Sequence, residues 1–167
     1  MKKSAMTSVN KPFTDKIFAL VDGDQKTIEW RTKPLPRGLH YVYETKNKGG
    51  CGKVIGEMTI IGYMKFSSID NIPDRIIGFG KVDRKDLKKY AKGRPLYANA
   101  IVNAKRYDTP KELGEFWAYN ENLQKCFDEQ EGYCFEEWSS FCRPLTQPPQ
   151  SWRYVVNWQC VMEAVKC

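Results

Sequence analysis

Three charged residues within one short segment could bind a ligand or take part in a reaction. They are Lys26, Glu29 and Arg31, in the segment KTIEWR. Alternation of side chains along this segment predicts a strand that carries Glu29 and Arg31 on one face, with Lys26 at its start. A guanidinium can donate paired hydrogen bonds to phosphate or a base edge, and a carboxylate can accept one from an exocyclic amino group. The group is therefore a candidate nucleotide site, although an exposed ladder of ion pairs would use the same residues.

Aromatic and polar residues elsewhere could complete such a site. Tyr43 lies in the alternating segment 39–45, and Trp152 follows a turn that contains two prolines. Both rings could stack on bases, and Gln150 and Ser151, just before Trp152, could form hydrogen bonds to one. The alternative is structural, because a chain with 22 aromatic residues needs most of them in its core, and Gln150 and Ser151 also suit a turn.

Motifs of several enzyme classes are absent. His40 is the only histidine, and no serine or cysteine motif accompanies it, so a histidine-based triad lacks support. The GGCGK segment at residues 49–53 lacks the Ser or Thr that follows Lys in a phosphate-binding loop, and we expect a hairpin turn there. Glu57 is a candidate general base. Hydrolase chemistry that uses Lys26 with Glu29 or Glu57 therefore stays open.

The six cysteines do not form a common metal-binding motif. No CxxC pair occurs, and Cys126, Cys134 and Cys142 follow one another at intervals of eight residues, which is not a common zinc spacing. We expect reduced thiols and no cofactor. Zinc held by these three cysteines is the alternative, because metal ligands need only converge in space.

The composition is that of a basic, single-domain protein. The chain has 167 residues, a formal net charge of +7 and a pI of about 9.1. Residues 1–111 hold 23 Lys and Arg against 11 Asp and Glu, whereas residues 112–145 hold 2 against 8. A basic body suits a polyanion such as RNA. Neither a membrane helix of about 20 apolar residues nor the apolar part of a signal peptide occurs, so we expect a cytoplasmic protein with no membrane partner.

The elements that would position the charged group are short. Residues 1–11 are polar and without periodicity, which predicts a flexible tail. Alternating or β-branched patterns predict strands at residues 27–31, 39–45, 53–66, 95–105 and 152–158. Helices are predicted at residues 12–23 and 83–91 and from a capping box at 109–112. Together they indicate one α+β domain over residues 12–167, built around a curved sheet or small barrel.

Several of these segments, in this order, resemble the ASCH family, within the PUA-like superfold. They are KTIEWR, YVYET with GGCGKVIGE, the segment Tyr97–Tyr107 leading into Thr109-Pro110, and Pro148-Pro149-Gln150-Ser151-Trp152. The resemblance covers about residues 12–112 and 146–158. Residues 113–145 look like an acidic, cysteine-containing helical insertion of the kind that phage and bacterial members carry.

The resemblance implies a PUA-like small β-barrel of five to six strands with flanking short helices. It also implies a cleft lined by the strand that carries Lys26 and Arg31, with the loop before Trp152 at its edge. Related folds bind RNA or modified bases. One branch of the family is an amidohydrolase for N4-acetylcytidine that relies on Lys, Thr and Glu, but Glu29 stands here where that branch has the Thr. A carboxylate cannot replace an alcohol nucleophile, so this activity is not expected.

Our leading hypothesis is a non-catalytic module that binds RNA or a modified nucleotide through a basic cleft and a base-reading carboxylate. The residues assigned to it are Lys26, Glu29, Arg31, Tyr43, Gln150, Ser151 and Trp152. The alternative is a hydrolase, either an RNA nuclease or a modified-nucleoside amidohydrolase, that uses Lys26 with Glu29 or Glu57. A third possibility is a protein partner that binds the insertion at 113–145.

Overall fold

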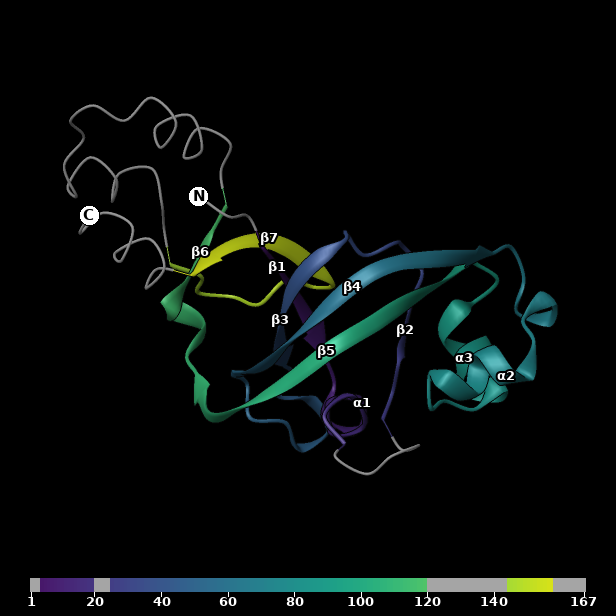
Figure 1. Cartoon of the computed structure of the whole chain (residues 1–167), viewed down its shortest axis with the longest axis horizontal. Helices are drawn as coiled ribbons and strands as arrows, with labels where there is room; N and C mark the ends of the chain where they lie inside the picture. The colour runs from purple at the N-terminus through teal and green to yellow at the C-terminus, as the bar shows by residue number, and fades with distance from the viewer. Residues whose placement is uncertain (1–3, 20–24, 120–143, 158–167) are drawn as a thin grey trace.

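The backbone is organised around one mixed sheet. The computed structural model describes residues 4–19, 25–119 and 144–157. Within them, seven strands are hydrogen-bonded in the order β2-β5-β4-β3-β1-β7-β6 (Figure 1). The strands are β1 (Ser4–Val9), β2 (Ile28–Arg31), β3 (Gly38–Glu44), β4 (Val54–Phe66), β5 (Leu96–Lys111), β6 (Phe116–Ala118) and β7 (Trp152–Asn157). The predicted α+β class is confirmed, but there are seven strands rather than five to six, and the sheet of the described residues is open, with β2 and β6 as its edges.

Short helices flank this sheet. Helices α2 and α3 lie together at one end of β4 and β5, and α1 lies near the middle of the sheet (Figure 1). The helices are α1 (Lys11–Ile17), α2 (Asp74–Phe79) and α3 (Arg84–Ala91), with 3-10 turns η1 (Asn47–Gly49), η2 (Ile69–Asn71) and η3 (Leu113–Glu115). Helix α3 agrees with its prediction, whereas α2 was missed because its six residues are too few to show a helical period.

The flexible tail expected at residues 1–11 is wrong for the part that the structure describes. Strand β1 lies inside the sheet, parallel to β3 and antiparallel to β7, and all six of its residues are buried. Its hydroxyl groups have partners there, since Thr7 contacts His40 and Ser8 donates to the carbonyl of Pro149. The polar composition concealed this strand because its partners come from distant parts of the chain.

The helix predicted from the capping box at residues 109–112 is also wrong. Strand β5 continues to Lys111, where it pairs with Val54 of β4, so long-range pairing overrides the local helix signal. A capping box does form three residues later, between Glu112 and Glu115, and it opens η3. Of the expected helical insertion at 113–145, the beginning is therefore η3 and β6, and residues 120–143 lie outside the described part.

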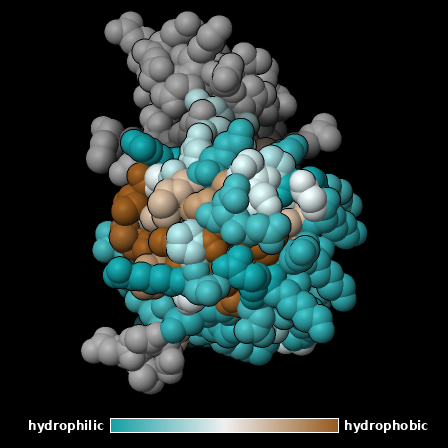
Figure 2. All heavy atoms as spheres, turned by 90° about the vertical axis from the view of Figure 1, so that its right-hand side faces the viewer, coloured by the Kyte–Doolittle hydropathy of each residue, from teal (hydrophilic) through white to brown (hydrophobic). Residues whose placement is uncertain are grey.

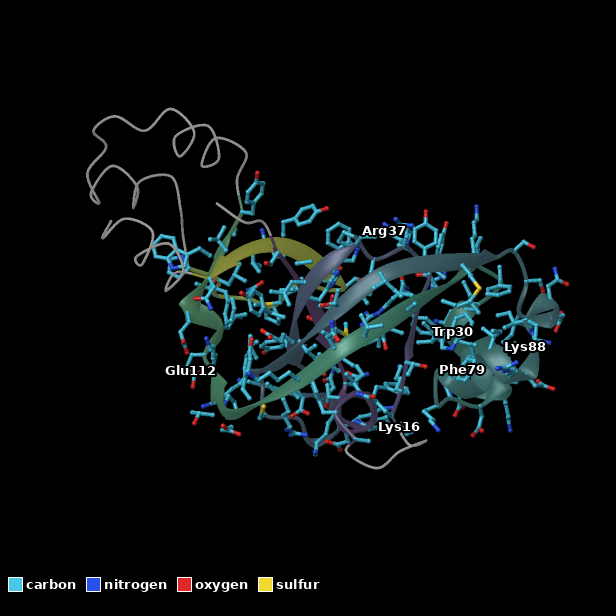
Figure 3. The ribbon with its side chains drawn as sticks, viewed as in Figure 1. Lys16, Trp30, Arg37, Phe79, Lys88 and Glu112 are labelled. Atoms are coloured by element: carbon cyan, nitrogen blue, oxygen red, sulfur yellow. The ribbon has the colours of Figure 1, made fainter. Side chains whose placement is uncertain are left out.

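One apolar core holds strand β2 in place. Ile28 and Trp30 belong to the core that α2 and α3 form against the sheet, at the end of the molecule that Figure 2 shows. Figure 3 shows Trp30 near the labelled Phe79 of α2. Gly80, just after α2, allows this packing, because a Cβ there would lie 2.2 Å from the indole nitrogen of Trp30. Since successive side chains of a strand point to opposite faces, Glu29 and Arg31 face away from this core.

Candidate nucleotide-binding site

A cavity of about 640 Å³ lies beside β2. Five separate parts of the chain line it: the end of β1 with the start of α1, strand β2 with Lys26 before it, the turn between β3 and β4, helix α3 with the residues next to it, and the loop before β7. Its lining contains five basic residues and two acidic ones, so its formal charge is positive. They are Lys26, Arg31, Lys48, Lys89 and Lys92, with Glu29 and Asp86.

The predicted charged group lies together in this cavity. Glu29 is between the two cations, with Oε2 2.6 Å from Lys26 Nζ and Oε1 2.9 Å from Arg31 Nη2. The side chains of Lys26, Glu29 and Arg31 are only 4%, 6% and 12% exposed. The alternative of an exposed ladder of ion pairs is therefore wrong, because these groups are largely removed from water. We call these three residues the charged triad.

Hydrogen-bonding capacity remains in the charged triad. Nη2 of Arg31 donates to the backbone oxygen of Ser8 at 2.7 Å, while the buried Nε of Arg31 has no hydrogen-bond partner. The ammonium of Lys26 has three donors, and its ion pair with Glu29 accounts for one of them. A buried donor without a partner is unfavourable, so a ligand that supplies acceptors here would be bound more tightly.

Burial and charge act on the triad in opposite directions. Burial lowers the pKa of Lys26, and the nearby Glu29 offsets only part of this effect. Burial tends to raise the pKa of Glu29, but Lys26 and Arg31 outweigh it and bring that pKa below its usual value. The carboxylate of Glu29 is therefore ionised at neutral pH.

Helix α1 contacts the triad at Lys26. The ring of Phe13 lies 4.5 Å from Nζ of Lys26, close enough for a cation–π contact. The backbone N–H of Lys26 donates to the carbonyl of Lys16 at 2.8 Å, and the ammonium of Lys16, which Figure 3 labels, donates to the carbonyl of Lys81 between α2 and α3. These bonds join α1 to both β2 and the helical end, so the position of Lys26 is fixed by three elements.

Gln150, one of the residues assigned to base binding from the sequence, also lines the cavity. Ser151 lies beside it, because the carbonyl of Ser151 accepts a hydrogen bond from the N–H of Ser8, a lining residue, at 3.0 Å. The loop before β7 therefore comes next to β2, although about 120 residues separate them in the sequence. This is the arrangement that a cleft edged by the loop before Trp152 requires.

Three predicted residues lie elsewhere. Tyr43 is 4% exposed and packs in a core with Tyr41, and Trp152 packs against a second apolar core. Glu57 accepts a hydrogen bond from the hydroxyl of Tyr107 at 2.8 Å and does not line the cavity. The structural alternative therefore describes Tyr43 and Trp152 better than stacking does, and Glu57 is not among the residues that line the cavity with Lys26.

Sequence reasoning missed the wall formed by α3. Lys89 and Tyr90 from this helix and Lys92 at its end line the cavity, and the side chain of Tyr90 is exposed. The lysine-rich segment KKYAKGR was the available signal. It was not used because nothing local places this helix opposite β2. Lys48, from the turn between β3 and β4, was also not among the predicted site residues.

No group of three His, Cys, Asp or Glu side chains that could hold a metal occurs in residues 4–19, 25–119 and 144–157. The three cysteines considered for zinc lie outside those ranges. No helix in the described part of the chain is both long and apolar enough to cross a membrane.

Solved structures with the same arrangement of strands identify the fold. The ASCH protein from Zymomonas mobilis aligns with a TM-score of 0.59 and 18% identity, over 98% of this chain and 94% of that one. Its serine-to-alanine variant gives 0.63 and 17%, over 96% and 95%, and its tyrosine-to-phenylalanine variant gives 0.61 and 16%, over 99% and 98%. The chain has the fold of an ASCH domain. In sequence, no family model and no curated protein matches it.

The ASCH fold confirms the resemblance that the segment order indicated. It also explains why the triad, the loop at Gln150 and the turn at Lys48 converge, since the fold brings these distant segments to one side of β2. At 16–18% identity, the likeness concerns the backbone. The roles of individual side chains must therefore come from the geometry of this chain.

Proposed function

We propose that this ASCH-fold protein binds single-stranded RNA, with one nucleotide in the cavity beside β2. The observation that carries this proposal is the charged triad, a buried group of two cations and one carboxylate that lines a positively charged cavity and has donors to spare. Phosphate and base edges supply the acceptors that such donors need. A volume of about 640 Å³ lies within the range of small-ligand pockets.

Each part of the lining has a role in this proposal. Arg31 and Lys26 would bind phosphate or acceptor atoms of the base. Lys48 and Lys89, which come from two different parts of the lining, would attract the backbone, and this adds affinity without sequence preference. Tyr90 offers an exposed aromatic ring on the α3 wall, where a base could stack. A single strand fits this role better than a duplex, because its bases are free to enter a cavity.

The role assigned to Glu29 is mainly to hold Lys26 and Arg31 in place. Both of its oxygens face a cation, and its pKa is lowered, so it acts only as an acceptor. Its remaining lone pairs suit an exocyclic amino group or a ring N–H. In this proposal the carboxylate therefore favours a base with such a donor.

A second candidate is an RNA nuclease. It is favoured by the lowered pKa of Lys26, since a buried lysine with a shifted pKa can transfer protons near neutral pH. Glu57 would not take part, because it is bonded to Tyr107 outside the cavity. Incubation with labelled single-stranded RNA, followed by product analysis, separates the two: intact RNA favours the binding module, and cleavage that Lys26→Arg abolishes favours the nuclease.

The binding proposal is tested with Arg31→Ala against Arg37→Ala. Both variants remove one positive charge, but Arg37 is exposed and does not line the cavity. We expect Arg31→Ala to weaken RNA affinity by about 1–3 kcal/mol and Arg37→Ala to have a much smaller effect. Arg31→Lys, which keeps the charge that faces Glu29, serves if the alanine variant is unstable. This site would be excluded if both Arg31 variants fold and bind RNA as tightly as the unchanged protein.

A further inference from the structure

We propose that Tyr63, Lys65 and Tyr97 form a second contact for the same RNA strand, next to the cavity. We call these residues the tyrosine platform. This inference rests on the proposed function, because the platform would bind the part of the RNA strand that leaves the cavity. It adds the expectation that the protein binds oligonucleotides of several residues more tightly than it binds a single nucleotide.

Strand pairing places the platform on the same face of the sheet as the charged triad. Tyr97 of β5 lies directly opposite Arg31 of β2 and opposite Lys65 of β4. Residues directly opposite each other in antiparallel strands point to the same face, with Cβ atoms about 5 Å apart. Arg31, Tyr97 and Lys65 therefore form a continuous row across three strands, which begins at the cavity.

The next row has the same property. Tyr63 of β4 is opposite Asn99 of β5, which is opposite Glu29 of β2. Asn99 is fully buried, and its side chain bonds to the backbone of Leu35 and Glu29, so the chain covers the sheet there. Tyr63 extends beyond this cover, because its side chain is 51% exposed. The platform is thus the uncovered continuation of the face that holds Glu29.

The side chains of the platform suit a single strand of nucleic acid. The rings of Tyr63 and Tyr97 meet edge to face at 5.4 Å between centroids, and Nζ of the exposed Lys65 lies 6.0 Å from the Tyr97 ring. An aromatic surface with an adjacent cation is the usual means by which proteins bind single strands without sequence preference. Two large, partly exposed rings side by side also contribute little to a core.

The surrounding sequence supports a polyanion rather than another partner. Residues 58–69 and 87–107, which include the platform strands and the end of α3, contain seven Lys and Arg and no Asp or Glu, whereas Glu29 and Asp86 lie in the cavity itself. A polyanion is therefore attracted to the surface around the platform. Continuity with Arg31 makes the strand already held in the cavity the occupant that we assign.

The experiment measures affinity for a single nucleotide, cytidine monophosphate, and for a ten-residue oligocytidine. The double variant Tyr63→Leu/Tyr97→Leu removes stacking but keeps apolar bulk. Phe79→Leu is the matched control, because Phe79 is an aromatic residue of similar exposure, 41%, on α2. We expect the double variant to bind the oligonucleotide at least tenfold more weakly, to bind the nucleotide within twofold of the unchanged protein, and to unfold at the same urea concentration.

The outcomes distinguish failure of this inference from failure of the proposed function. If neither the nucleotide nor the oligonucleotide binds to the unchanged protein, the proposed function fails and the platform fails with it. If both bind but the double variant leaves oligonucleotide affinity unchanged, only the platform is excluded. A third outcome is that the unchanged protein self-associates and the double variant does not, while both bind RNA equally well. This outcome would assign the tyrosines to a protein interface and overturn the inference. Lys65→Gln gives an independent check: it should weaken oligonucleotide binding and leave nucleotide binding unchanged.

Discussion

Two buried groups of polar side chains differ in how they use their hydrogen bonds. His40 is fully buried, with Nδ1 2.6 Å from the hydroxyl of Thr7 and Nε2 2.8 Å from the carbonyl of Pro36. A carbonyl can only accept, so Nε2 carries the proton and Nδ1 accepts from Thr7. Both ring nitrogens then have partners. The charged triad is almost equally buried, yet Arg31 Nε has no hydrogen-bond partner.

This difference separates a structural polar group from a candidate binding group. The neutral pair of His40 and Thr7 joins β3 to β1 and has no side-chain donor left for a ligand. The triad keeps two cations close to one carboxylate beside a cavity, an arrangement in which the desolvation of the charges is only partly offset. Burial alone is therefore a poor indicator of function, whereas burial with unused donors beside a cavity is a better one.

The largest expected effect comes from removing the centre of the triad. Glu29→Ala leaves Lys26 and Arg31 buried without their partner, and the loss of one member of a buried ion pair typically costs about 3–5 kcal/mol. Urea unfolding followed by tryptophan fluorescence measures this loss. Asp15→Ala is the matched control, because Asp15 pairs with Lys11 on the surface of α1 and its side chain is 46% exposed. A surface pair of this kind contributes at most about 1 kcal/mol.

If Glu29→Ala lowers the free energy of unfolding by less than about 1 kcal/mol, the contrast between the triad and the His40–Thr7 pair is wrong. Such a small loss would mean that water already reaches the triad and that its burial does not set its energetics. Glu29→Gln sharpens the test, because it keeps the shape and one acceptor. We expect an intermediate loss of stability and a change in which base is preferred, whereas a nuclease would lose turnover and keep its affinity.

The next effect is the dependence of stability on pH that His40 produces. Burial lowers the pKa of His40 to about 4, well below the ordinary value of 6.5, although the Pro36 carbonyl opposes this shift. As the pH falls below 6.5, the unfolded chain takes up a proton that the folded protein does not, so stability falls. Linkage predicts a loss of about 2 kcal/mol between pH 7 and pH 5. Urea unfolding at these two pH values measures it.

A variant with His40→Gln provides the control. It should be less stable at pH 7, because Gln cannot reproduce both hydrogen bonds of the ring in a packed site. It should also lose most of the change between pH 7 and pH 5. An unchanged pH dependence in this variant would show that other groups titrate in this range and that His40 is not the neutral counterpart of the triad.

The sequence predicted the triad because its residues are local. Lys26, Glu29 and Arg31 lie within six positions, and strand alternation alone places two of them on one face. It could not predict that they are buried, since burial depends on α1, on Ser8 of β1 and on the turn at Lys48. The α3 wall was missed for the same reason. The sequence identifies α3 as a helix but does not say which strand it faces.

The fold was predictable where the pattern is strong and local. Strands β2, β3, β4 and β7 and helix α3 agree with their predictions to within a few residues. Strand β1 was missed because its serines and threonines resemble a tail until β3 and β7 bury them. The helix expected after Thr109 failed because β5 stays paired with β4 as far as Lys111. In both cases, distant partners decided the structure.

A smaller effect is expected at the rim of the cavity. Tyr90 is 43% exposed, so Tyr90→Ala should leave the free energy of unfolding within about 0.5 kcal/mol. If a base stacks on this ring, the same change should weaken RNA binding by about 1–3 kcal/mol, and Tyr90→Phe should keep the affinity. Fluorescence anisotropy with a labelled oligonucleotide measures both variants. Full affinity in Tyr90→Ala would confine recognition to the charged triad.

The smallest effect tests whether the exposed lysines of α3 are equivalent. Lys88 and Lys89 are neighbours, both exposed, and each contributes one charge to the same helix, but only Lys89 is among the residues that line the cavity (Figure 3 labels Lys88). If Lys89 contacts a phosphate, Lys89→Ala should reduce the slope of log affinity against log salt by about 0.7, the value for one contact to a single strand. Lys88→Ala should change the slope much less, because its charge acts only through the general field. Titrations between 50 and 200 mM salt would show about a twofold to threefold difference between the two variants. Equal slopes for the two variants would mean that all the lysines of α3 attract RNA equally, whether or not they line the cavity. The evidence for a specific cavity would then depend on Arg31 and Lys26 alone.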